Sequence, residues 1–149
     1  MSEEQQKLLQ RIYAQQQMVE QNIALYQQQL ELIQTLIRSY QSGLLILEEL
    51  EKKEEGEEML MEIGGNIQVQ AKLVEPSKVI RGIGKNIKIE QSTEDAKSAL
   101  TEQIERFGKQ HDALRQEYEK NLAQAQALSN QFDQIAAQVQ GAMNQSQEE

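Results

Sequence analysis

Few residues in this sequence have side chains that could perform catalysis or bind a metal, and they are not grouped. Cysteine is absent and His111 is the single histidine, so neither a disulfide nor a thiolate or paired-histidine metal site is predicted. The run Gly64-Gly65-Asn66 resembles a phosphate loop, but neither a helix nor a Lys-Ser/Thr pair follows it. No nucleophile–base pair and no convergent carboxylate pair emerges. We therefore predict that the protein is not an enzyme and has no catalytic residue, metal or cofactor.

Charge and hydropathy argue against two further classes of function. The 149 residues carry a net charge of −9 and a pI of about 4.7. No cluster of Lys and Arg is interleaved with aromatic residues, so nucleic-acid binding is not expected. No apolar run approaches the roughly 18 residues of a membrane span, and residues 1–9 do not have the pattern of a secretion signal. We expect a cytoplasmic protein, with the acidic run 48–58 as a solvated helix end.

Two long stretches carry apolar residues at alternating intervals of three and four, the heptad pattern of a coiled coil. In the first stretch these positions are Leu9, Ile12, Gln16, Val19, Ile23, Tyr26, Leu30, Ile33, Ile37, Tyr40, Leu44 and Leu47. In the second they are Leu100, Ile104, Phe107, His111, Leu114, Tyr118, Asn121, Ala125, Leu128, Phe132, Ile135, Val139 and Ala142. We predict helices over about residues 3–55 and 93–144, a frayed tail at 145–149, and Ser92 or Thr93 as the cap of the second helix.

The two predicted helices have matched lengths of about 50 residues, or about 75 Å. Equal helices joined by a shorter segment fold back on each other as an antiparallel coiled coil, so both chain ends are expected at one tip. This register brings Leu47 near Leu100. It also places Tyr26 near Asn121, where a phenol–amide hydrogen bond in the seam could fix the alignment.

The segment between the helices, about residues 58–91, follows a different period. The phrases "IGGNIQVQ" (63–70) and "IGKNIKIE" (83–90) each place Gly and Asn between two short runs with alternating apolar residues. Each phrase predicts a β-hairpin with one apolar face, and residues 75–78 form the turn that joins them. Because the helices use their seams on each other, other chains must cover these faces. The predicted oligomer interface consists of Met61, Ile63, Ile67, Val69, Ala71, Leu73, Ile80, Ile83, Ile87 and Ile89.

This order of elements resembles the α-class subunit of the prefoldin family over nearly the whole chain. The resemblance is carried by "LMEIGGNIQVQAKLVE" and "KVIRGIGKNIKIEQSTEDA" between matched helices, since the β class of that family has one hairpin. It implies a single domain over 1–149 with a mostly helical α+β fold. In that fold a long antiparallel two-helix coiled coil carries two tandem β-hairpins that join an oligomeric β-barrel. It further implies a hexamer of two α-class and four β-class subunits.

The resemblance also implies a function, that of an ATP-independent chaperone, or holdase. Such a protein binds unfolded polypeptides at the coiled-coil tips and delivers them to a group II chaperonin. The candidate client-binding residues are Leu8, Leu9, Ile12, Tyr13, Phe132, Ile135, Val139 and Met143. Seam members such as Ile12 and Val139 are expected mainly to complete the coiled coil, which favours Leu8, Tyr13 and Met143 for client contact. The alternative is a structural coiled-coil scaffold, or a prefoldin-like assembly subunit without client transfer.

Overall fold

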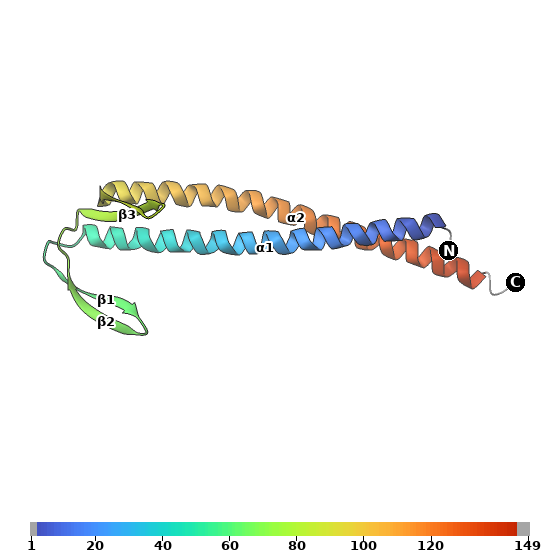
Figure 1. The fold of residues 1–149 in the computed structure, drawn as a ribbon, viewed down its shortest axis with the longest axis horizontal. Helices are drawn as coiled ribbons and strands as arrows, with labels where there is room; N and C mark the ends of the chain where they lie inside the picture. Colours follow the sequence, from blue (N-terminus) through green and yellow to red (C-terminus); the bar gives the residue numbers. More distant parts are fainter. Residues whose placement is uncertain (1–2, 146–149) are drawn as a thin grey trace. The chain divides into compact units, whose positions relative to one another are not determined.

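The computed structural model of the chain describes residues 3–145, which form two long helices with two hairpins between them (Figure 1). In chain order the elements are α1 (Glu3–Glu51), β1 (Glu58–Gly64), β2 (Ile67–Lys72), β3 (Lys78–Gly84), β4 (Ile87–Ser92) and α2 (Thr93–Gln145). The predicted fold class is confirmed, and no closed barrel occurs among the described residues of this one chain. Two compact units are distinguished: the terminal unit (residues 3–34 and 110–145) and the hairpin unit (residues 35–109).

Helix α1 ends at Glu51, earlier than the predicted end near residue 55. Its last turn is tightened, because the amides of Lys52 and Lys53 donate to carbonyl oxygens three residues earlier in the chain. The chain then turns at Gly56, which has a φ of 79° and whose N–H donates to the carbonyl oxygen of Leu73 at 2.6 Å. Most of the acidic run therefore lies outside the helix, in the segment that leads into the first hairpin.

In the terminal unit, α1 and α2 pack around a small apolar core. Ile12, Val19 and Leu128 are buried together at its centre. The partly buried side chains packed against them are Ile23, Ala125, Phe132 and Ile135. All seven residues are heptad positions of the two predicted seams, so hydrophobic burial along one stripe of each helix holds this unit together.

Polar pairs in the same unit define the direction of packing. Gln27 Nε2 donates to the Tyr118 hydroxyl at 3.0 Å, and Gln34 Nε2 lies 3.4 Å from His111 Nε2. Residue numbers rise along α1 as they fall along α2, so the helices are antiparallel here, as predicted.

The hydrogen bond predicted between Tyr26 and Asn121 is replaced by a local one. The Asn121 side-chain amide donates to the carbonyl oxygen of Glu117 in its own helix, at 2.8 Å. A carbonyl one turn earlier satisfies a short amide side chain without a partner across the seam. The alignment therefore depends on other pairs, such as that of Gln27 with Tyr118.

In the hairpin unit the helices pack through other seam residues. The rings of Tyr40 and Phe107 meet edge to face, with centroids 5.4 Å apart and planes at 80°, a favourable aromatic geometry. One turn further along, the Leu100 side chain lies opposite Gly43, where an added Cβ would be 3.5 Å from Leu100 Cδ1. Tyr40, Phe107 and Leu100 were all predicted as seam positions, so the heptad pattern also describes this unit.

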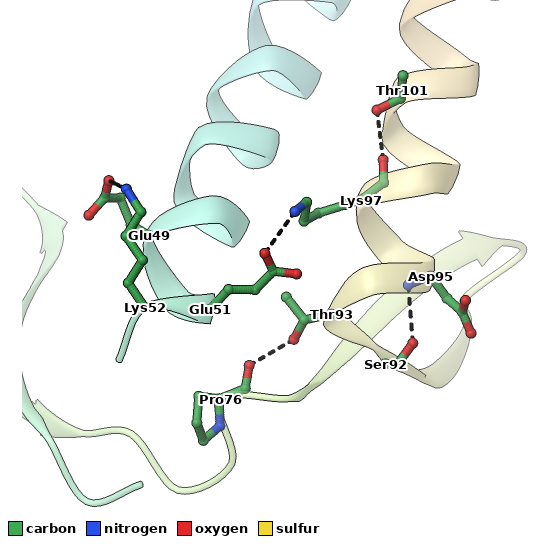
Figure 2. A network of polar contacts seen from close by, with 9 residues as sticks. All are labelled: Glu49, Glu51, Lys52, Pro76, Ser92, Thr93, Asp95, Lys97 and Thr101. Atoms are coloured by element: carbon green, nitrogen blue, oxygen red, sulfur yellow. Dashed lines mark hydrogen bonds and ion pairs between the residues drawn. The ribbon is translucent and has the colours of Figure 1, made fainter. Parts of the chain in front are cut away.

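The start of α2 is tied to the loop between the hairpins by polar contacts (Figure 2). The Ser92 hydroxyl accepts a hydrogen bond from the Asp95 N–H at 3.1 Å, which makes Ser92 the N-cap. Thr93 is 2% exposed, its hydroxyl donates to the Pro76 carbonyl oxygen at 2.8 Å, and its N–H donates to that of Ser77 at 2.8 Å. Of the two residues predicted as caps, Ser92 caps the helix and Thr93 anchors it to the loop.

An ion pair joins the two helices beside this loop: Lys97 Nζ lies 2.7 Å from Glu51 Oε2 (Figure 2). The hydrogen bond that Lys97 Nζ donates to the Glu51 carboxylate raises the pKa of Lys97 above its ordinary value of 10.5. A raised pKa means that the pair stabilises the folded state at neutral pH and that this contribution is lost as the pH rises through the folded-state pKa.

We therefore expect Lys97→Met to lower the unfolding midpoint near pH 8 and to have a smaller effect near pH 11, because the contribution of the pair falls once the pH exceeds the ordinary lysine pKa of 10.5. Chemical unfolding of both proteins at the two pH values measures this difference. The matched control is Lys52→Met, which removes the exposed Lys52–Glu49 pair and should change the midpoint little at either pH. An effect of Lys97→Met that does not vary with pH would contradict the assignment.

Each hairpin is a separate two-stranded antiparallel sheet: β1 pairs with β2, and β3 with β4. The turn residues Gly65-Asn66 and Lys85-Asn86 all have positive φ, as two-residue type I′ turns require. The register shifts just before each turn, at Gly64 and Gly84, where φ is 109°. The two predicted hairpins and the role of Gly and Asn in their turns are thus confirmed.

Lys85 has a φ of 49°, a left-handed conformation that costs a residue with a Cβ about 1–2 kcal/mol. Lys85→Gly should therefore stabilise the fold, by about 0.5–1 kcal/mol once the added freedom of glycine in the unfolded chain is subtracted. Lys85→Ala is the matched control, because it removes the same charge but keeps the Cβ. Thermal unfolding compares the two, and equal midpoints would show that Lys85 is not strained.

Candidate functional site

The first candidate surface is the apolar face of the first hairpin. Met61 pairs with Val69 across the β1–β2 ladder, and alternation along the strands places Ile63 and Ile67 on the same face. All four side chains are exposed. Ala71 and Leu73, which were predicted with them, are half-buried. This face thus lacks cover within the described chain, although such apolar faces are normally buried.

The second hairpin has a similar face, with one change from the predicted set. Ile83 and Ile87 are exposed and Ile89 is half-buried. Ile80, however, pairs with Glu90, and alternation puts it on the opposite face of the hairpin. Apolar residues therefore occur on both faces of β3.

Ile80 borders an apolar groove within the hairpin unit. The groove has a volume of about 320 Å³ and is lined by Gly43, Ile46, Leu47, Val79, Ile80, Arg81, Ala96 and Leu100. The Arg81 guanidinium Nε donates to Gln91 Oε1 at 2.8 Å, which links β3 to β4 through their side chains. Ile46, also exposed, was not among the predicted interface residues because it falls off the α1 seam.

The second candidate surface lies on the parts of α1 and α2 nearest the chain ends. Leu8 is 46% exposed and Tyr13 is 60% exposed, so both side chains can be reached from solvent. Ile12 and Val139, in contrast, are buried, and Leu9, Phe132 and Ile135 are half-buried. Buried seam residues cannot contact another polypeptide unless the helices separate. Met143 lies outside the residues whose side chains the structure describes.

Potential metal ligands are not grouped in the described part of the chain. Residues 3–142 contain no group of three or more His, Asp or Glu side chains placed to hold a metal ion. His111 is half-buried, with Gln34 as its neighbour across the seam. This placement gives it a packing role in the coiled coil.

Several exposed apolar residues lie outside the predicted seams and outside the predicted interface. Leu60 and Val74 in the hairpin region and Leu45 near the end of α1 are all exposed. In the terminal unit Met18, Leu25 and Leu32 are exposed as well. Each of these last three residues directly precedes a seam residue, so a scan of the positions beside the seam would have found them.

Comparison with known proteins shows which family has this architecture. The family model described as Prefoldin subunit matches residues 19–138. A curated relative named Prefoldin subunit alpha, from Thermofilum pendens, is 30% identical over 83 residues. The aligned part covers 56% of this chain and 64% of the relative, so the match spans less than two thirds of that protein.

A structural comparison agrees on the fold. A cryo-EM structure described as filamentous PFD from Methanocaldococcus jannaschii matches with a TM-score of 0.67 and 22% sequence identity. The match covers 77% of this chain and 95% of that one. Among the described helices of this chain, none has a stretch long and apolar enough to cross a bilayer.

Proposed function

Because the chain belongs to the prefoldin family and has the two hairpins of its α type, we propose that it is an ATP-independent holdase subunit. In this proposal it binds unfolded polypeptides and delivers them to a group II chaperonin in the cytoplasm. The observation that carries the proposal is the pairing of two exposed apolar surfaces on one chain. One surface, on the hairpins, serves assembly, and the other, near the chain ends, serves client binding.

The hairpins are proposed to join the chain to other prefoldin subunits. Exposed side chains on both hairpins, such as Met61, Ile67 and Ile87, would be buried when further strands complete a β-barrel. Open sheet edges favour this arrangement, since a two-stranded sheet leaves backbone donors and acceptors unpaired on each side. The proposed assembly is a hexamer of two chains of this type and four one-hairpin β subunits.

Client binding is proposed to use residues near the chain ends. Leu8 and Tyr13 are exposed, while the neighbouring seam residue Ile12 is buried between the helices. Client contact with Leu8 and Tyr13 therefore does not require the helices to separate. Each contact would be weak, but several coiled coils in one assembly act together through effective concentration. The proposal includes no catalytic step.

Aggregation of an unfolded protein tests the proposal. The chain is purified with a one-hairpin prefoldin partner, and the assembly is added, without nucleotide, to reduced lysozyme as it aggregates. Suppression of light scattering near one assembly per lysozyme supports a holdase. A scaffold without client transfer predicts an intact assembly that leaves the scattering unchanged, and this result would refute the proposed function.

A further inference from the structure

A stripe of exposed apolar residues runs along α1 in the terminal unit. Met18, Leu25 and Leu32 are 63%, 50% and 61% exposed. They lie seven residues apart, and a seven-residue step drifts by only about 20° around a helix. The three side chains therefore project from one side of α1. They are distinct from the residues proposed above for client binding.

A groove lies beside this stripe. It has a volume of about 480 Å³ and is lined by Tyr26, Ile33, Gln110, Ala113, Leu114 and Glu117. Tyr26 and Ile33 directly follow Leu25 and Leu32 in α1, about 100° further around the helix, so the groove and the stripe share the same turns of α1. We call the stripe and the groove together the α1 flank. Its apolar side chains offer contact area, and its groove has room for a few side chains of a bound chain.

Helix α1 is nearly free of charge along the stripe and rich in amides, whereas the part of α2 that lines the groove carries Glu117. Residues 12–30 contain one charged residue, Glu20, together with seven glutamines and one asparagine. In α2, residues 121–142, which follow the groove toward the chain end, contain a single charged residue, Asp133. Side-chain amides both donate and accept hydrogen bonds, so they can pair with peptide groups whatever the sequence of the bound chain.

We propose that the α1 flank binds an extended segment of unfolded polypeptide, with client side chains on the stripe and in the groove. An unfolded chain has peptide N–H and C=O groups that need partners, which the amides supply, whereas a folded helix has already paired most of its own. This inference rests on the proposed holdase function and adds a second contact surface to it.

A second copy of this chain fits the α1 flank less well. Stable protein interfaces bury roughly 800 Å² on each partner, far more than three side chains and one open groove provide. Two chains that each carry a net charge of −9 also repel one another. A small apolar surface on an amide-rich helix with little charge is better suited to weak contact with many sequences.

Photo-crosslinking on the assembled full chain tests the proposal. A photoreactive side chain replaces Leu25, or replaces Glu20, which is exposed and lies about 140° around the helix. A third variant carries the probe at Tyr13 and reports the proposed function itself. Each of the three variants is irradiated in the presence of reduced, carboxymethylated lysozyme, which is unfolded, and separately in the presence of folded lysozyme.

We expect the probe at position 25 to crosslink unfolded lysozyme about tenfold more than the probe at position 20, a ratio that corresponds to about 1.4 kcal/mol. Crosslinking at position 13 but not above the control at position 25 would overturn this inference and leave the holdase function standing. Crosslinking at neither would overturn both. Equal yields with folded lysozyme, or crosslinks between two copies of the chain, would also overturn the inference.

A binding measurement provides the second test. The double variant Leu25→Gln/Leu32→Gln replaces two exposed side chains with amides that suit a helix, so folding should be kept, as circular dichroism can verify. We expect its assembly to bind carboxymethylated lysozyme about tenfold more weakly than wild type. Ala24→Gln, an exposed position just outside the stripe, is the control and should bind as wild type. Unchanged affinity of the double variant would contradict the proposal.

Discussion

Replacing Ile87 by glutamate is expected to leave this chain unable to join a stable assembly. Ile87 begins β4 and is exposed on the apolar face of the second hairpin, which we propose to be buried by neighbouring subunits. A carboxylate buried there without a partner costs about 3–5 kcal/mol, so association should weaken by roughly two to four orders of magnitude.

Lys88→Glu is the matched control for this substitution. Lys88 pairs with Gly82 and lies on the other face of the same hairpin, and its replacement changes the net charge by two rather than one. Mass measurement in solution with a one-hairpin partner should find free chains for Ile87→Glu and intact assemblies for Lys88→Glu. If Ile87→Glu assembles like wild type, this face of the hairpin is not the interface.

The second large effect is expected in the core of the terminal unit. Leu128 is 6% exposed and packs with Ile12 and Val19. Leu128→Ala should destabilise this unit by about 2–5 kcal/mol, because the lost burial and the remaining cavity both contribute. The helix content should therefore melt at a lower temperature, while assembly through the hairpins is kept.

Leu122→Ala is the control, since Leu122 is in the same helix and 43% exposed. It should cost less than about 1 kcal/mol, because the side chain is only partly removed from water. Urea unfolding followed by circular dichroism measures both changes. Equal losses of stability in the two variants would mean that the buried cluster does not hold the terminal unit together.

The fold could be predicted from the sequence where the signals are periodic. An alternation of three and four identified seam residues such as Val19, Leu128 and Phe107, because a helix buries one stripe against its partner. The Gly and Asn of the two repeated phrases identified the turns, because type I′ geometry needs positive φ. These signals are local, so they do not depend on knowing the rest of the fold.

Other features depended on contacts between distant residues and could not be read from local patterns. Helix α1 ends at Glu51 because the chain must turn at Gly56 to bond with Leu73. Thr93 anchors α2 to Pro76 rather than capping it, and Asn121 bonds within its own helix. Propensity allowed several outcomes at each of these positions, and the tertiary contacts selected one.

For the candidate sites, the sequence indicated that apolar surfaces would be exposed, but it indicated less well which residues form them. Both exposed residues near the start of the chain, Leu8 and Tyr13, lie off the seam and were preferred for that reason. Ile80 was predicted as an interface residue, and it lies on the face of β3 opposite Ile83, so its place in the interface stays a prediction. The stripe of Met18, Leu25 and Leu32 was not predicted. Each of these residues directly precedes a seam residue, and the sequence alone does not show whether such a neighbour is buried or exposed.

Aggregation of reduced lysozyme in the presence of the Leu8→Gln/Tyr13→Gln assembly tests the central claim most directly. Both side chains are exposed, so the variant should keep its core, its helix content and the mass of its assembly. We expect it to need about tenfold more assembly than wild type to suppress scattering equally, since two apolar contacts are lost at each tip. Wild-type suppression by an intact variant assembly would contradict the assignment of client binding to these residues.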